Sequence, residues 1–388
     1  MKVTKLFKGF FESENGGILL IVCTVISLLL ANSSFSETYL NFWHFIFSGL
    51  SIEHWINEGL MAIFFLLIGL ELKREILAGE LSNVKSAMLP VFAAIGGMVV
   101  PAAIYAFFNY GTITQSGAGI PMATDIAFAI GILSLLGRRV PASLKILLTA
   151  IAVIDDLGAI LIIAIFYTTS ISLINLSIVL VVFVVLLFLN RFKINYLIVY
   201  ILGGIAMWYF MLHSGVHSTL AGILLAFVIP FGEGEKESLS YRLENWLHKP
   251  VALVILPLFA LANTAIVFAS GWNTGLAAPG SIGIFTGLII GKPLGICLFS
   301  FIAVSIGLSA LPNGLNWKQV LGIGFLAGIG FTMSIFITLL AYQDPFLITE
   351  SKISILIASL VSGILGFVWL KYVLKKPKLI SVKKIKSK

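Results

Sequence analysis

Charged residues are scarce in this chain of 388 residues, because Asp, Glu, Lys and Arg together make up 11% of it. Soluble domains carry about 25% of these residues. The hydrophobic share is 59% and the mean hydropathy is +1.07. These values exclude an ordinary soluble domain and indicate an all-α, polytopic membrane protein that forms one integral membrane domain over residues 1–388.

Cysteines and catalytic motifs are also sparse. The two cysteines, Cys23 and Cys297, fall in apolar segments, so no disulfide framework is indicated. The sequence has no Walker A motif, zinc signature or nucleophile elbow, and the glycine pair at 322 and 324 follows no strand. We therefore expect no cofactor and no enzymatic activity. An ATP-driven pump is excluded unless a partner subunit supplies the nucleotide site.

Twelve apolar segments are long enough, or nearly so, to cross a hydrocarbon core of about 30 Å. They are expected at 16–32, 55–72, 87–108, 121–136, 146–167, 176–190, 196–213, 216–230, 250–269, 282–304, 319–341 and 353–374. No large soluble domain separates them. The first segment follows three lysines without a small-residue cleavage site, so we expect it to be retained as a helix.

The net charge of +8 does not indicate a nucleic-acid partner, because the basic residues lie in short loops and in the tail from Lys371. With the N-terminus inside, 23 of the 25 basic residues face the cytoplasm, Lys352 lies outside and Lys292 lies within the membrane. This asymmetry predicts cytoplasmic N- and C-termini and an even number of spans.

Two of the segments contain residues that interrupt a helix. The segment 121–136 and the residues just before it contain Gly117, Gly119, Pro121 and Thr124, and the segment 319–341 contains Gly322, Gly324, Gly328, Gly330 and Thr332. Unwound backbone at mid-membrane survives only beside protein or water. Paired interrupted segments in the two halves of a transporter indicate the binding site.

Three of the four aspartates, Asp125, Asp155 and Asp156, lie inside apolar segments, as does Lys292. Each such charge costs about 2.5–3.5 kcal/mol at the centre of a bilayer, so four would cost about 10–14 kcal/mol if they faced lipid. That rivals the net stability of a typical protein. We therefore expect these groups to face a cavity or each other and to handle an ion or a proton.

Asp155 and Asp156 are adjacent on one expected helix, so they point about 100° apart and need a ligand from another helix. Asp125, next to Thr124, is the candidate. Burial and a neighbouring like charge raise the pKa of a carboxylate, and one that titrates near neutral pH exchanges its proton for a cation. Hard cations such as Na⁺ and Li⁺ prefer carboxylate, hydroxyl and carbonyl oxygens. The alternatives are purely structural roles: Asp125 would be the N-cap of a helix, and Asp155 would form an ion pair with Lys292 that takes no part in ion binding.

Lys292 lies about ten residues from either end of its segment, so snorkelling to the interface is strained. Three roles remain open for it. The lysine neutralises Asp155, offsets the negative ends of broken helices, or carries a proton.

A second group of charges lies at the expected cytoplasmic face. Its members are Glu71, Lys73, Arg74, Glu75, Arg242, Glu244 and His248. These are either ordinary interfacial charges that set topology or a network whose protonation gates access. Glu58 is expected to be a solvated interfacial carboxylate. His217 lies at an outer turn, where a histidine titrates near physiological pH but needs no special role.

Taken together, these residues resemble the NhaA-type bacterial Na⁺/H⁺ antiporters over nearly the whole chain. The motifs that carry the resemblance lie at 64–75, 123–128, 154–159, 214–217, 291–295 and 328–335. The resemblance implies inverted repeats with two interrupted helices that cross at mid-membrane. It also implies a core within 87–167 and 282–374, and a panel within 16–72 and 176–269 that forms a homodimer contact.

The resemblance further implies electrogenic exchange of Na⁺ or Li⁺ for H⁺ across the bacterial inner membrane, active at alkaline pH. Asp155 and Asp156 would bind Na⁺ or Li⁺ and protons in competition, with Thr124 and Asp125 nearby and Lys292 stabilising the assembly. The pH response would involve Glu71, Arg74, Glu75, Glu244 and His248, with His217 as a further candidate.

The chain departs from the family pattern at three places. Glu58 stands where an Asp is usual, Asn245 stands where a histidine can occur, and the outer segment 32–54 looks short for a dimerising β-hairpin. These departures affect the expected dimer contact and pH profile, but not the transport chemistry.

Two other classes of protein remain for comparison. An intramembrane aspartyl protease needs facing carboxylates on different helices, one usually in a Gly-x-Gly-Asp setting, and no Asp here has that setting. A Na⁺-coupled symporter or a channel that shares a broken-helix core is the other alternative, and a test for proton counterflow separates it from an antiporter.

Overall fold

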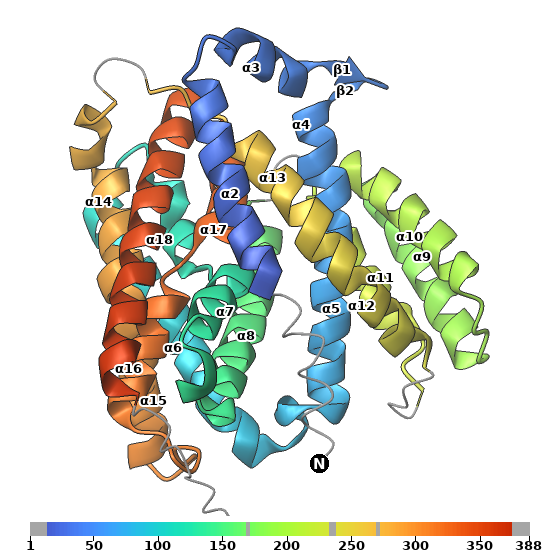
Figure 1. Cartoon of the computed structure of the whole chain (residues 1–388). Coiled ribbons are helices and arrows are strands. Elements are labelled where there is room, and N and C mark those ends of the chain that lie inside the picture. The colour runs from blue at the N-terminus through green and yellow to red at the C-terminus, as the bar shows by residue number, and fades with distance from the viewer. Residues whose placement is uncertain (1–13, 168–170, 233–237, 269–271, 375–388) are drawn as a thin grey trace, which may run out of the picture.

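The computed structural model describes residues 14–167, 171–232, 238–268 and 272–374, which are almost entirely helical (Figure 1). The N-terminal lysines and the basic tail after residue 374 lie outside the described residues. The first third comprises α2 (Glu14–Ala31), α3 (Ser36–His44), β1 (Ile46–Phe47), β2 (Leu50–Ser51), α4 (Ile52–His54), η1 (Trp55–Leu60), α5 (Met61–Ala78), η2 (Glu80–Ser82) and α6 (Val84–Asn109).

The middle of the chain comprises η3 (Gln115–Met122), α7 (Ile126–Ser134), η4 (Gly137–Arg139), α8 (Ala142–Phe166), α9 (Leu173–Arg191), α10 (Leu197–Leu212), α11 (Leu220–Val228), α12 (Leu239–Pro250), η5 (Val251–Ile255) and α13 (Leu256–Asn263). The last third comprises η6 (Thr274–Ala277), α14 (Pro279–Thr286), η7 (Gly287–Gly291), α15 (Lys292–Ser305), α16 (Trp317–Ala327), α17 (Phe331–Ala341) and α18 (Pro345–Val373).

Each of the twelve expected segments coincides with a helix or with consecutive helices. In the described ranges, seven helical stretches are long and apolar enough to cross a membrane, or up to nine if each of two bent pairs is one span. The 18 residues of α5 would also suffice in length, but the charges from Glu71 to Glu75 make its second half polar. The expectation of a polytopic helical membrane protein is therefore confirmed.

The helices form two groups side by side in Figure 1. One contains α6, α7, α8 and α14 to α18, in which α15 packs along α6 and α16 along α18. The other contains α5 and α9 to α13, in which α11 packs along α5 and α10 along α9. Helix α2 contacts both groups through α7 and α13.

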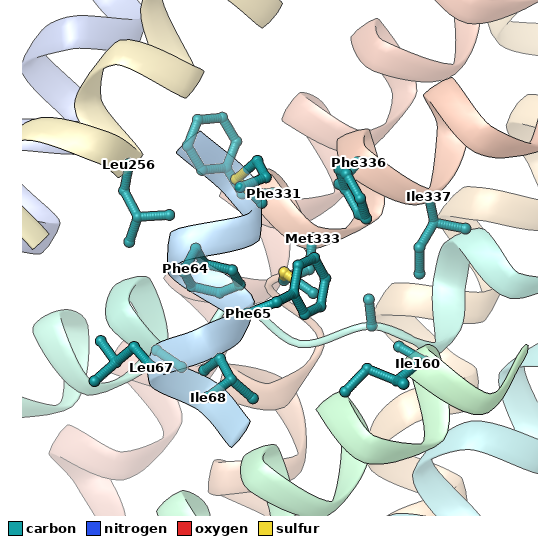
Figure 2. Packing of buried hydrophobic residues seen from close by; sticks show 14 of the residues in the cluster. Phe64, Phe65, Leu67, Ile68, Ile160, Leu256, Phe331, Met333, Phe336 and Ile337 are labelled. Atoms are coloured by element: carbon teal, nitrogen blue, oxygen red, sulfur yellow. The ribbon is translucent and has the colours of Figure 1, made fainter. Parts of the chain in front are cut away.

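Aromatic side chains of α5 fill the space between the two groups (Figure 2). The Phe65 ring lies 5.3 Å from the ring of Phe336 on α17, measured between centroids. Phe259 of α13 approaches the same Phe336 ring at 6.4 Å. All three side chains are buried, so α5 and α13 pack against the second interrupted segment through apolar contacts.

The outer segment 32–54, which looks short for a dimerising β-hairpin, does contain a hairpin with strands of two residues each. Strand β1 pairs antiparallel with β2, with Ile46 opposite Ser51 and Phe47 opposite Leu50. Ser48 and Gly49 both have positive φ, at 53° and 86°, as the tightest hairpin turns require. A two-residue turn of this kind needs so few residues that α3 also fits in the segment.

Several boundaries also differ from the expectation, among them the start of α18. Helix α18 begins at Pro345, eight residues before the expected start, because Asp344 caps it by accepting a hydrogen bond from the backbone N–H of Phe346 at 2.8 Å. Lys352 consequently lies in the helix with its side chain buried rather than in an outer loop.

Candidate functional site

Both segments are interrupted, as the glycine and proline pattern predicts, and they meet at their breaks, as the family resemblance implies. The first changes from η3 to α7 through extended residues 123–125, and the second bends by 49° between α16 and α17. The backbone N–H of Asp125 donates a hydrogen bond of 2.7 Å to the carbonyl of Ile329. The two breaks therefore touch through their backbones.

Glycine is required where the second break meets its neighbours. A Cβ at Gly328 would collide with the backbone carbonyl of Leu288, and a Cβ at Gly330 would collide with the Ser334 hydroxyl. The backbone groups freed by the break are satisfied by hydroxyls. The Phe331 N–H donates to Ser359 Oγ at 3.1 Å, and Ser334 donates to the Ile120 carbonyl at 2.7 Å.

Asp125 joins the N-termini of both half-helices. Its Oδ1 accepts a hydrogen bond of 3.0 Å from the Phe128 N–H, which confirms the N-cap predicted from sequence. Its Oδ2 accepts from the N–H of Thr332 at 3.2 Å and from the Thr332 hydroxyl. One carboxylate therefore balances the positive ends of α7 and α17.

Lys292 and Asp155 form a fully buried ion pair, with 2.7 Å between Lys292 Nζ and Asp155 Oδ2. The same ammonium donates to the carbonyl of Met122, at the C-terminal end of η3. The hydroxyl of Thr124 lies 2.8 Å from Asp155 Oδ2 and 2.9 Å from the carbonyl of Ala327. Of the three roles left open for Lys292, the geometry thus contains both the ion pair and the contact with a negative helix end.

Asp156 has a different environment. Its side chain is 1% exposed, and neither carboxylate oxygen has a hydrogen-bond partner in the described part of the chain. The Oδ1 of Asp155 is likewise without a partner there. Buried carboxylate oxygens without partners are costly, so this place suits water, a proton or a cation.

A cavity of about 420 Å³ adjoins Asp156. Its polar lining comes from both breaks, from α8 and α12 and from the charged face of α5, and its apolar lining comes mainly from α5, α7, η5 and α13. The polar lining residues are Thr124, Asp125, Asp156, Thr332, Glu71, His248 and Lys249. Because Lys249 is exposed, the cavity links the buried carboxylates to the surface beside α12.

The charged residues at that end form a connected group, which we call the charged cluster. Arg74 Nε lies 3.0 Å from Glu244 Oε1, and an Arg74 terminal nitrogen lies 3.3 Å from Glu75 Oε1. His248 Nε2 lies 3.5 Å from Glu71 Oε1 and 3.7 Å from Glu244 Oε1. Two elements far apart in the sequence, α5 and α12, are thus linked by ion pairs at the cavity mouth.

His217 does not belong to this cluster, because its Nε2 lies 3.1 Å from the carbonyl of Tyr167, which follows α8. Glu58 is not simply solvated either. Its side chain is half-buried and its Oε2 accepts a hydrogen bond from the Ser218 hydroxyl.

Sequence reasoning missed the particular role of Lys73. Its ammonium donates to the carbonyls of Ala226, Phe227 and Ile229 at 3.3, 2.8 and 2.6 Å, and so caps the C-terminal end of α11. One feature of the sequence could have indicated this role. Helix α11 contains no capping residue of its own and ends directly before Ile229 and Pro230, so its last carbonyls need a donor from another part of the chain. Thr332 was identified only as a hydroxyl in the interrupted segment, without its contact to Asp125.

A bundle of membrane-crossing helices with two touching breaks beside buried, unpartnered carboxylates defines a secondary ion transporter. Comparison with protein families matches residues 8–370 to the family described as Na⁺/H⁺ antiporter 1. The chain belongs to this family.

Its relatives cover almost its whole length. It is 64% identical over 375 residues to the Na(+)/H(+) antiporter NhaA 1 of Flavobacterium johnsoniae, with 96% of this chain and 98% of the relative covered. It is 58% identical over 376 residues to the Na(+)/H(+) antiporter NhaA of Dechloromonas aromatica, with 96% and 97% covered. The resemblance to the NhaA-type family is thereby confirmed.

A solved structure supports the fold alone. The sodium proton antiporter MjNhaP1 from Methanocaldococcus jannaschii at pH 8 matches with a TM-score of 0.57 and 16% sequence identity. The match covers 96% of this chain and 99% of that chain.

Proposed function

We propose that this chain is an electrogenic secondary antiporter that exchanges cytoplasmic Na⁺ or Li⁺ for external H⁺ and so contributes to sodium and pH homeostasis. The observation that carries the proposal is the buried Asp156 carboxylate, which has no partner in the described residues and adjoins the 420 Å³ cavity. Family membership over residues 8–370 supports the same reaction.

The ion site in this proposal consists of Asp155, Asp156, Thr124 and Asp125. A proton on a carboxylate removes the charge and an oxygen lone pair that a cation needs, so the two ions compete for the same atoms. Two adjacent carboxylates that share one monovalent cation release more protons than they bind cations, and this imbalance makes the exchange electrogenic.

Lys292 takes the role of a replaceable counter-ion. In the described conformation its ammonium neutralises Asp155 at 2.7 Å. A cation that arrives between Asp155 and Asp156 competes with the ammonium for the same oxygen. When protons replace the cation and the carboxylates become neutral, the pair loosens, because the attraction between opposite charges disappears.

Alternating access is proposed to occur by movement of two groups of helices relative to each other. The core consists of helices within 87–167 and 282–374, and the panel of helices within 16–72 and 176–269. The cavity is lined from both groups, and the apolar contacts of Phe65 and Phe259 with Phe336 form a surface without hydrogen bonds along which they can slide. The described state is open at the cavity mouth beside α12.

The charged cluster is proposed to set the pH response. Glu71 and His248 line the cavity, and their ion pair at 3.5 Å exists only while the histidine is protonated. Alkaline pH removes that proton and releases Glu71, which frees the path to Asp156. Glu244, Arg74 and Glu75 hold α5 and α12 together in the same group.

The proposed orientation rests on the charges of the chain, and the proposed assembly rests on an exposed apolar hairpin. We propose a bacterial inner-membrane protein with both termini in the cytoplasm, so that the cavity mouth beside Lys249 faces inward. The hairpin β1–β2, with exposed Ile46 and Phe47, provides the outer contact of a homodimer.

The experiment is Na⁺-induced collapse of a pH gradient in everted membrane vesicles at pH 7 to 8.5. The native chain should dissipate the gradient with Na⁺ and Li⁺ but not with K⁺, and Asp156→Asn should be silent although still inserted. Asp344→Asn is the matched control, because Asn also caps a helix and Asp344 lies at the start of α18. A native chain that responds to none of these cations would overturn the proposal in favour of a proton-uncoupled symporter or channel.

A further inference from the structure

A groove separate from the ion site lies between α15, α16 and α18. The labels of α15 and α16 are at the lower left of Figure 1. Its volume is about 850 Å³, and nearly all of its lining side chains are apolar. Leu298 on α15 and Trp369 on α18 contribute to it and are both exposed. The groove therefore opens on the surface that the membrane covers.

The depth of the groove matches one leaflet. Its lining runs from Ile289 to Phe301 along η7 and α15, which is about 18 Å at 1.5 Å per residue. Half of a hydrocarbon core of about 30 Å is about 15 Å. An acyl chain that lies along α15 therefore fits the groove from the interface to mid-membrane.

The end of the groove near Phe301 and Trp317 has the features of a membrane interface. Trp317 and Lys318 lie at the start of α16, and Trp369 lies in the last part of α18 and donates its indole N–H to the Lys318 carbonyl at 2.7 Å. Tryptophan is enriched at the level of lipid headgroups. These residues therefore mark the depth at which a headgroup would lie.

The charge at this end is positive and uncompensated. Lys318 is exposed, and no ion pair to it occurs in the part of the chain that the structure describes. The sequence contains no Asp or Glu between Glu244 and Asp344, and none after Glu350. No acidic side chain lines the groove. Glu350, the acidic residue of α18, lies in the first part of that helix, whereas Trp369 and Lys371 lie near its C-terminal end, where Lys371 adds a second positive charge.

We propose that this groove binds an anionic membrane phospholipid, with one acyl chain along α15 and the phosphate at Lys318. Charge complementarity favours this occupant over a second copy of the chain, because two such faces would bring lysine against lysine. A lysine near an anionic surface contributes about a fivefold preference for the negatively charged lipid.

The test is native mass spectrometry of the purified full chain with equal amounts of phosphatidylglycerol and phosphatidylcholine. The native chain should retain one phosphatidylglycerol in preference to phosphatidylcholine. Lys318→Ala should reduce that preference about fivefold. Arg138→Ala, which removes an exposed charge from the short turn η4 outside the groove, should leave it unchanged.

A second pair of variants tests the groove rather than the charge. Leu298→Trp fills the groove and should remove the retained lipid, whereas Ile302→Trp, one turn further along α15 and also exposed, should not. Retention of phosphatidylglycerol by Lys318→Ala at the native level, or no headgroup preference in the native chain, would overturn the proposal. A loss of dimer mass in Leu298→Trp alone would instead identify the groove as a contact between two copies and would also overturn it.

Discussion

The ion pair between Lys292 and Asp155 makes a quantitative prediction about stability. Lys292→Met removes the partner of a buried carboxylate and leaves the Met122 carbonyl without its donor. Breaking a buried pair from one side costs about 3–5 kcal/mol. The unfolding entropy is about 2.1 cal/mol/K per residue, so over 388 residues this cost lowers the unfolding temperature by about 4–6 °C.

The assay is thermal unfolding of the purified protein in detergent at pH 7 without Na⁺. The second single variant, Asp155→Asn, also destabilises because it leaves a buried ammonium without its counter-ion. The double variant removes both charges and should be more stable than the sum of the single effects predicts, by about 2–3 kcal/mol. Combining Lys292→Met with Asp344→Asn should instead be additive, since Asp344 caps α18 away from the pair. Additive effects in the Lys292–Asp155 cycle would refute the reasoning.

Three further predictions concern the surroundings of the site. Gly328→Ala should abolish Na⁺-dependent proton exchange in vesicles, because the Leu288 carbonyl occupies the place of the Cβ; activity near the native level would contradict the crossing geometry. Lys73→Met should destabilise the purified protein by about 1–3 kcal/mol, because it removes the ammonium that donates to the carbonyls of Ala226, Phe227 and Ile229 at the end of α11; an unchanged unfolding temperature would rule out the capping role. His248→Gln should flatten the pH profile of exchange while the Na⁺ affinity at pH 8.5 stays close to the native value, because the His248–Glu71 ion pair exists only while the histidine is protonated and is absent at alkaline pH; a native pH profile would exclude the histidine from the response.

The charges were predictable from sequence because membrane burial makes each of them expensive. Asp125, Asp155, Asp156 and Lys292 stand out in apolar segments for this reason, and the structure places all of them near the two breaks. The breaks themselves were predictable because glycine and proline at mid-membrane weaken a helix. The family resemblance then supplied the crossing of the two segments.

Specific partners were harder to predict, because they depend on contacts between segments far apart in the chain. Lys292 and Asp155 are separated by 137 positions, and sequence reasoning left three roles open for the lysine. The contact of Thr332 with Asp125 spans 207 positions. The hairpin was missed for a local reason, since its strands contain only two residues each and carry no alternating pattern.

The central claim is that protons and Na⁺ compete for the carboxylate of Asp156. The most direct measurement is proton release from the purified protein on addition of NaCl in weakly buffered detergent solution at pH 8, with KCl as the control. The native chain should release at least one proton for each Na⁺ bound, and Asp156→Asn should release fewer. Na⁺ binding to the native chain without proton release would contradict this competition.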